Sequence, residues 1–164
     1  MSRWTEFTAA RPNIARVYDY WLGGKDNFEA DRQEALRLLA VYPLMAKLAR
    51  DDRQFLGRAV TWVAGQGIRQ FLDVGSGLPT AQNTHQAAQA ADPGARVVYA
   101  DNDPVVVAHA RARLAAPGVE AIEGDLRDPM GILGDPIVCK LIRPDEPACV
   151  VLALVLHFFD FEHA

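Results

Sequence analysis

Long hydrophobic runs are absent from this sequence. The longest one, ACVVLALVL from Ala148 to Leu156, is too short to cross a lipid bilayer as a helix. The N-terminal stretch carries Arg3, Glu6 and Arg11, whereas a signal peptide requires an uninterrupted apolar segment. The sequence therefore predicts a cytoplasmic protein with no membrane partner.

Basic residues and cysteines are also scarce. With 17 Lys and Arg against 21 Asp and Glu, the formal net charge is −4, which leaves no broad positive surface to neutralise a nucleic-acid backbone. The two cysteines, Cys139 and Cys149, fit neither a CxxC pair nor a metal-ligand pattern. We therefore expect reduced thiols, no bound metal, and a small-molecule partner instead of a nucleic acid.

Helical periodicity dominates the first part of the chain. Apolar residues recur there at steps of three and four, as they do on the buried face of a helix. Gly23-Gly24 is typical of a helix end, while Asp26 and Glu29 resemble a capping box that opens the next helix. The predicted helices span residues 12–22, 26–40 and 44–64.

Short apolar strands alternate with helical stretches after residue 69. The predicted strands are Gln70–Val74, Arg96–Ala100, Val119–Ile122 and Cys149–Leu154. The predicted helices are Thr80–Ala91, Pro104–Ala115 and a weaker one around Met130–Ile142. Alternation of this kind, with nearly unbroken apolar strands, indicates an α/β fold with a parallel sheet covered on both faces.

The first of these strands leads into a glycine loop in the stretch FLDVGSGLPT. Gly75 and Gly77 lack a Cβ, so a ligand can approach their backbone closely. A dinucleotide fingerprint would need a third glycine where Thr80 stands. Asp73, two residues before the loop, would repel a pyrophosphate but can accept hydrogen bonds from an ammonium group. The loop therefore favours a ligand with an amino-acid moiety.

Two further carboxylates follow the next two strands. Asp101 comes directly after the second strand, where it can accept hydrogen bonds from both hydroxyls of a ribose, and Asp103 is expected to cap the following helix. Asp125 follows the third strand, where its carboxylate can accept from an adenine amino group and the Leu126 backbone N–H can reach a ring nitrogen. Three acidic strand ends around one crevice favour a positively charged ligand.

These motifs together resemble a known family. FLDVGSGLPT, VVYADNDP, GDLRDP and VLHF resemble the successive motifs of class I S-adenosylmethionine-dependent methyltransferases. The N-terminal ARVYDYWLGGKDNFEADR resembles the signature of an actinobacterial S-adenosyl methyltransferase family formerly classed as a domain of unknown function. The resemblance implies a helical lid over residues 1–65 and a Rossmann-like domain over residues 66–164. It also implies S-adenosyl-L-methionine as cofactor and a small-molecule methyl acceptor.

The resemblance assigns residues to each part of the cofactor. The methionine portion is expected at Asp73, Gly75, Ser76 and Gly77, and the ribose at Asp101. The adenine is expected beside Asn102, Asp125 and Leu126. The lid residues expected to close over the ligand are Tyr18, Gly24 and Asn27. No catalytic base is assigned, because a lone histidine that follows an apolar strand, as His157 does, is more often structural than a base.

Two alternatives remain open from the sequence. One is a module that binds the cofactor without turnover, and the other is an NAD-dependent oxidoreductase, which Asp73 and the absent third glycine disfavour. The sequence stops directly after the fourth predicted strand, so the C-terminal strands of the fold are expected to be missing. An exposed edge at Cys149–Leu154 would then favour self-association.

Overall fold

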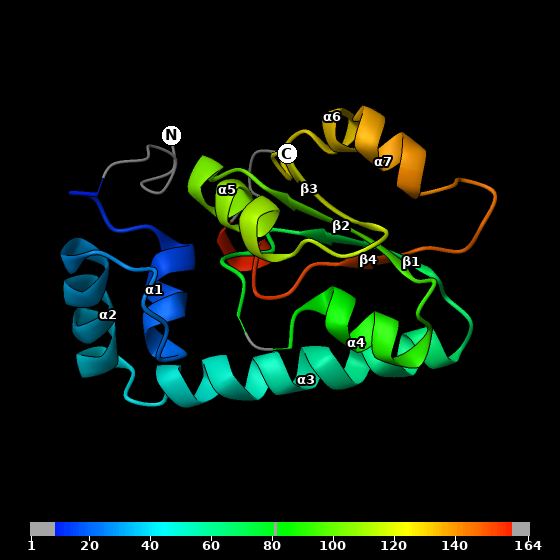
Figure 1. The fold of residues 1–164 in the computed structure, drawn as a ribbon. Helices are drawn as coiled ribbons and strands as arrows, with labels where there is room; N and C mark the ends of the chain where they lie inside the picture. Colours follow the sequence, from blue (N-terminus) through cyan, green and yellow to red (C-terminus); the bar gives the residue numbers. More distant parts are fainter. Residues whose placement is uncertain (1–8, 81, 159–164) are drawn as a thin grey trace.

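Four parallel strands form the sheet at the centre of the molecule (Figure 1). The computed structural model describes residues 9–80 and 82–158 of the chain. The strand order is β3-β2-β1-β4. The strands are β1 (Gln70–Val74), β2 (Arg96–Asp101), β3 (Val119–Glu123) and β4 (Cys149–Val151). The predicted α/β class and parallel sheet are confirmed.

Helices cover both faces of this sheet (Figure 1). Because side chains along a strand alternate between faces, Phe71 and Val97 join the apolar cluster under one set of helices, and Leu72 and Val98 join the other. The first set is α3 (Met45–Gly65), α4 (Thr84–Ala91) and α5 (Pro104–Arg113). The second set is α6 (Pro129–Leu133) and α7 (Pro136–Leu141). The result is a three-layer α/β/α arrangement.

The two short helices α6 and α7 replace the single helix predicted around Met130–Ile142. Asp135 and Pro136 divide it, because the Asp135 side chain accepts a hydrogen bond from Ile137 N at 2.7 Å and starts a new helix at Pro136. A proline at the first helical position has no N–H that would need an intrahelical partner. The division is therefore a local effect of one capping residue.

The N-terminal helices form a second apolar cluster beside the sheet. α1 (Ile14–Trp21) and α2 (Glu29–Val41) pack on the first part of α3, with Val17, Trp21, Ala35 and Ala49 buried between them. The later part of α3 instead packs on the sheet, through residues that belong to its core: Leu56, Val60 and Ala64. One helix thus belongs to both clusters, and in Figure 1 it runs along the whole lower side of the molecule.

The start of α2 differs from the prediction. The helix begins at Glu29, where Asp31 caps it by accepting a hydrogen bond from Phe28 N at 2.8 Å. The predicted capping residue Asp26 pairs instead with Arg113 at the end of α5. Asp26 is therefore used in a long-range ion pair, which removes it from the local capping box that the sequence suggested.

The fourth strand is shorter than predicted. β4 ends at Val151, and Leu154 has a φ of 48°, a left-handed conformation that interrupts a strand. β4 pairs with β1 through Phe71 and Cys149, and among residues 9–80 and 82–158 no strand lies on its other side. Self-association through this edge stays a prediction.

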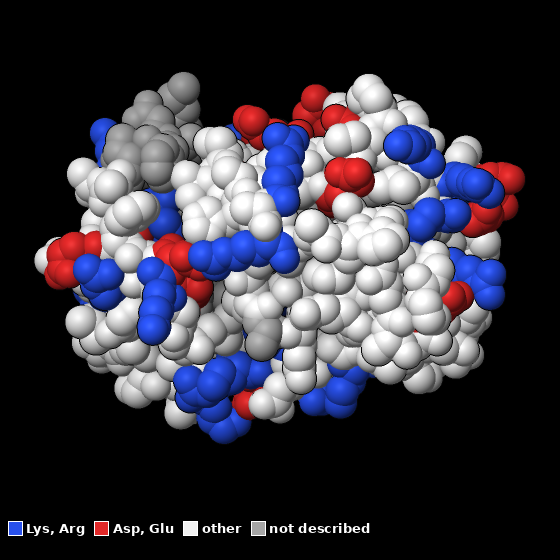
Figure 2. Space-filling model, viewed as in Figure 1, with Lys and Arg blue, Asp and Glu red and all other residues white. Residues whose placement is uncertain are grey.

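The charged side chains are mixed over the visible face of the molecule. Figure 2 shows basic and acidic groups interspersed among uncharged residues. Within the part of the chain that the structure describes, no helix is both long and apolar enough to span a bilayer. The surface seen here therefore offers no single field of positive charge for a polyanion.

Candidate functional site

The glycine loop and the end of β2 meet at the carboxyl edge of the sheet. The backbone N–H groups of Gly75 and Ser76 donate to the Ala100 carbonyl, at 2.8 and 3.4 Å. The N–H of Gly77 donates to Oδ2 of Asp101 at 2.9 Å. The loop expected to hold the methionine portion is thus bonded to the carboxylate expected to hold the ribose.

The two glycines of the loop have different surroundings. Both have left-handed backbones, with φ of 70° at Gly75 and 67° at Gly77. A Cβ at Gly75 would lie 2.5 Å from the Val155 side chain, whereas a Cβ at Gly77 would meet no atom within 4 Å. Gly75 is therefore needed for packing, and Gly77 leaves an open space that a ligand can occupy.

Asp101 is held rigidly at the end of β2. The side chain is 8% exposed, and Oδ1 accepts a hydrogen bond from Asp103 N at 3.0 Å. Burial raises the pKa of Asp101 above its usual range, which means that its charge is poorly solvated. Asp103 caps α5 by accepting from Val105 N at 2.8 Å, so its predicted capping role is confirmed. A buried carboxylate that is fixed in this way is suited to accept hydroxyl hydrogen bonds.

The residues expected around the adenine lie next to the same edge. Asp125 accepts hydrogen bonds from Arg127, whose guanidinium lowers the pKa of that carboxyl group. Asn102 is exposed and also hydrogen-bonds to Asp125. Leu126 is half-buried against the apolar cluster of α6 and α7. Because Arg127 neutralises Asp125, the attraction for a cationic ligand at this edge is weaker than three free carboxylates would give.

Asp73 lies beneath the loop, at the end of β1. It is 4% exposed, and its Oδ2 accepts a hydrogen bond of 2.6 Å from the Thr84 hydroxyl. Burial raises the pKa of Asp73 to about 6. Its strongest contact is therefore with the first residue of α4, which it fixes relative to the sheet.

The helix expected at Thr80 begins only at Thr84. Asn83 folds the preceding residues into a turn, since its side chain accepts from Thr80 N at 3.0 Å and donates to Thr80 O at 2.6 Å. Gln82 has a φ of 61°, which no helical residue adopts. In the first turn of α4, the His85 N–H donates to the Tyr99 hydroxyl at 2.8 Å. That donor is therefore engaged inside the protein and does not point at a ligand.

The raised pKa of Asp73 predicts a specific dependence of stability on pH. Because the folded state binds this proton more tightly than the unfolded state, the resulting stabilisation is complete below about pH 4 and lost as the pH rises through about 6. We expect the free energy of unfolding of the wild type, relative to Asp73→Asn, to fall by about 2 kcal/mol between pH 4 and pH 7. Urea unfolding of both proteins across this range measures it. A constant difference between them would mean that Asp73 titrates normally.

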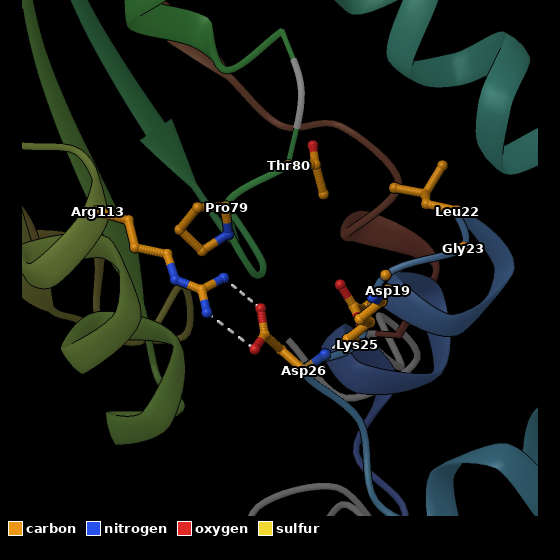
Figure 3. Close-up of a pocket in the computed structure, with 9 residues that line it drawn as sticks. Asp19, Leu22, Gly23, Lys25, Asp26, Pro79, Thr80 and Arg113 are labelled. Carbon is orange, nitrogen blue, oxygen red and sulfur yellow. Dashed lines mark hydrogen bonds and ion pairs between the residues drawn. The ribbon is translucent and has the colours of Figure 1, made fainter.

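The three predicted lid residues occupy different places. The Tyr18 hydroxyl donates to Oδ2 of Asp52 at 2.8 Å and to the Ala49 carbonyl at 3.0 Å, so it faces α3. Gly24 and Asn27 lie in the turn after α1, where Asn27 Nδ2 donates to the Gly24 carbonyl at 3.0 Å. This turn faces the loop after β1 across a cavity (Figure 3). The structure therefore places Gly24 on the cavity wall that faces the loop after β1. Tyr18 instead lies among the N-terminal helices.

Asp19 is a candidate residue that the sequence analysis missed. It lines the same cavity as Gly24 and is 3% exposed. In the helical pattern of apolar residues, Asp19 is simply a polar residue between Tyr18 and Tyr20. Its role becomes visible only through its partner, because Asn27 in the turn after α1 donates a hydrogen bond to the Asp19 carboxylate.

His157 lies outside any strand. It belongs to the 3-10 turn Leu156–Phe158, and its ring centroid lies 4.0 Å from that of Phe158. It is exposed. No contact of His157 with the glycine loop supports a role as base, and it stays unassigned.

Taken together, the sheet topology and the residues at its carboxyl edge define a Rossmann-like α/β protein with a candidate ligand site at the loops after β1 and β2. Over residues 2–164 the chain matches a family described as S-adenosyl methyltransferase. The chain belongs to this S-adenosyl methyltransferase family. No protein of curated function matches it.

Two crystal structures are similar to this chain. One is a proposed methyltransferase from Thermobifida fusca YX, with 48% sequence identity, a TM-score of 0.89 and 92% of the present chain covered. The other is a DUF574 family protein from Streptomyces avermitilis MA-4680, with 36% identity, a TM-score of 0.89 and 93% covered. The chain spans 57% of the first protein and 60% of the second, less than two thirds of either.

Proposed function

We propose that this chain binds S-adenosylmethionine at the carboxyl edge of its sheet and serves methyl transfer to a small-molecule acceptor. The contact between Gly77 N and Asp101 Oδ2, at 2.9 Å, is the observation that carries the proposal. It places an open glycine loop directly beside a buried carboxylate, so that one ligand with an amino-acid moiety and a ribose can reach both. The family match supports this reading and supports neither alternative function.

The described residues fit the cofactor. Gly75, Ser76 and Gly77 form the cradle for its methionine portion, and the space at Gly77 that a Cβ would occupy is open. Asp101 accepts the ribose hydroxyls. The adenine lies beside Asn102, Asp125 and Leu126, and Gly24 and Asn27 close the other side. Tyr18 supports that side through its hydrogen bonds to α3.

The cofactor, when bound, supplies a methyl group activated by a sulfonium. The chain's own contribution is alignment and exclusion of water, because an in-line methyl transfer needs no oxyanion hole. Asp101 holds the ribose, and the backbone of the glycine loop holds the methionine portion. The turn after α1 shields the opposite side from solvent. Asp73 contributes indirectly by fixing the start of α4 through Thr84.

Calorimetric titration with S-adenosylmethionine, S-adenosylhomocysteine and NAD tests the proposal. We expect dissociation constants in the micromolar range for the first two and no binding of NAD, because the third glycine of a dinucleotide fingerprint is absent. A folded sample that binds neither sulfur compound would contradict the proposal. Binding of NAD alone would favour the oxidoreductase.

A further inference from the structure

A cavity of about 410 Å³ lies between the turn after α1 and the loop after β1 (Figure 3). One wall consists of Asp19, Gly24 and Lys25, and the other includes Pro79 and Thr80. Pro79 and Thr80 directly follow the glycine loop. The cavity therefore continues the proposed cofactor site toward the N-terminal helices, on the side where the methionine portion would end.

Asp19 is the buried charge of this cavity. Its Oδ2 accepts hydrogen bonds from Asp26 N at 3.0 Å and from Asn27 Nδ2 at 2.8 Å. Both donors are neutral, and within residues 9–80 and 82–158 no Lys, Arg or His side chain forms an ion pair with Asp19. Burial raises the pKa of Asp19, and the guanidinium of Arg113, which is paired with Asp26, only partly offsets that rise.

The turn after α1 is built around this carboxylate. A Cβ at Gly24 would overlap Oδ1 of Asp19, so any side chain there would displace the carboxylate. Asn27 Nδ2 bonds both Asp19 and the Gly24 carbonyl, which fixes the turn relative to the carboxylate. Glycine at this position therefore keeps Asp19 in place and the space in front of it open.

The other charges of the cavity leave room for a zwitterion. Asp26 is neutralised by Arg113, with a dashed ion pair in Figure 3. Lys25 is exposed and lines the cavity, so a second cation and the buried Asp19 carboxylate face the same space. An α-amino acid group carries the matching ammonium and carboxylate. Asp73, by contrast, is covered by Thr84 and does not line the cavity.

We propose that the cavity binds the amino-acid end of S-adenosylmethionine, with Asp19 accepting a hydrogen bond from its ammonium group and Lys25 facing its carboxylate. The assignment rests on the proposed function and moves the ammonium partner from Asp73 to a residue of the N-terminal helices. A charge-assisted hydrogen bond to a buried carboxylate is among the stronger polar contacts in a protein. Asp19 is thus a cofactor-binding residue.

The test compares two ligands that differ in the amino-acid end. S-adenosylhomocysteine has it, and 5′-methylthioadenosine lacks it, while both share the adenosine and a neutral sulfur. We expect Asp19→Asn to weaken S-adenosylhomocysteine binding about 10- to 100-fold in calorimetry and to leave methylthioadenosine binding unchanged. Asp51→Asn, which changes an exposed carboxylate on α3, is the control and should alter neither affinity.

A second variant, Gly24→Ala, displaces the Asp19 carboxylate without changing Asp19 itself. Gly24→Ala should give the same selective loss, because the added methyl displaces the carboxylate. Equal affinities of wild type, Asp19→Asn and Gly24→Ala for S-adenosylhomocysteine would overturn the inference alone. Parallel loss of both ligands by both variants would also overturn it, since an ammonium contact cannot affect methylthioadenosine. A wild type that binds neither ligand would overturn the proposed function together with the inference.

Discussion

Replacement of Asp101 by Ala is expected to weaken S-adenosylmethionine binding by one to two orders of magnitude. The lost hydrogen bonds to the ribose correspond to about 1.5–3 kcal/mol. The same change removes the acceptor of the Gly77 and Asp103 N–H groups, so the glycine loop also loses its anchor. Calorimetric titration of the folded variant measures the effect.

The matched control for Asp101 is Asp92→Ala. Asp92 is also an aspartate, but it lies directly after the last residue of α4, where it pairs with the exposed Arg69. Its replacement should leave cofactor affinity unchanged. An unchanged dissociation constant for Asp101→Ala, in a sample that melts cooperatively, would remove Asp101 from the site.

Replacement of Arg16 by Met is expected to lower the free energy of unfolding by about 3–5 kcal/mol. The Arg16 side chain is 1% exposed, and its Nε donates to Asp31 at 2.8 Å, whose own side chain is 0% exposed. Its Nη1 also lies 3.6 Å from Oδ2 of Asp103. The substitution would leave the buried carboxylates of Asp31 and Asp103 without their shared cation. A buried carboxylate without a cationic partner costs free energy.

Urea unfolding compares this variant with Lys47→Met. Lys47 pairs with Asp51 on the surface of α3, with side chains 65% and 52% exposed. That exposed pair should contribute less than about 1 kcal/mol. If both substitutions lower the stability by the same small amount, the contacts of Arg16 with Asp31 and Asp103 do not hold α1 in place.

The sequence predicted the sheet well because its signals are local. Continuous apolar strands and the glycine loop at Gly75 and Gly77 need no distant partner to be recognised, and the structure confirms the strands β1 to β3 to within one residue. The Asp103 cap was also predictable, since the side chain bonds an N–H two residues away. Short-range chemistry of this kind can be read directly from the order of residues.

The missed features depend on contacts between distant segments. Asp26 does not form the predicted capping box, because it pairs with Arg113, a residue 87 positions later in the chain. The turn at Asn83 delays the start of α4 from the predicted Thr80 to Thr84. Asp19 could not be recognised, because its burial requires the turn that holds Asn27 against it. Periodicity alone cannot supply such partners.

The sharing of α3 between two apolar clusters limits how the cavity can change its width. Tyr18 ties α1 to α3 through the Ala49 carbonyl and Asp52, while Leu56 and Val60 hold the same helix in the sheet core. A hinged swing of α1 and α2 would have to break one of these attachments. On this side of the cavity, a movement of the turn at Gly23 and Gly24 is therefore the change that leaves both attachments of α3 intact.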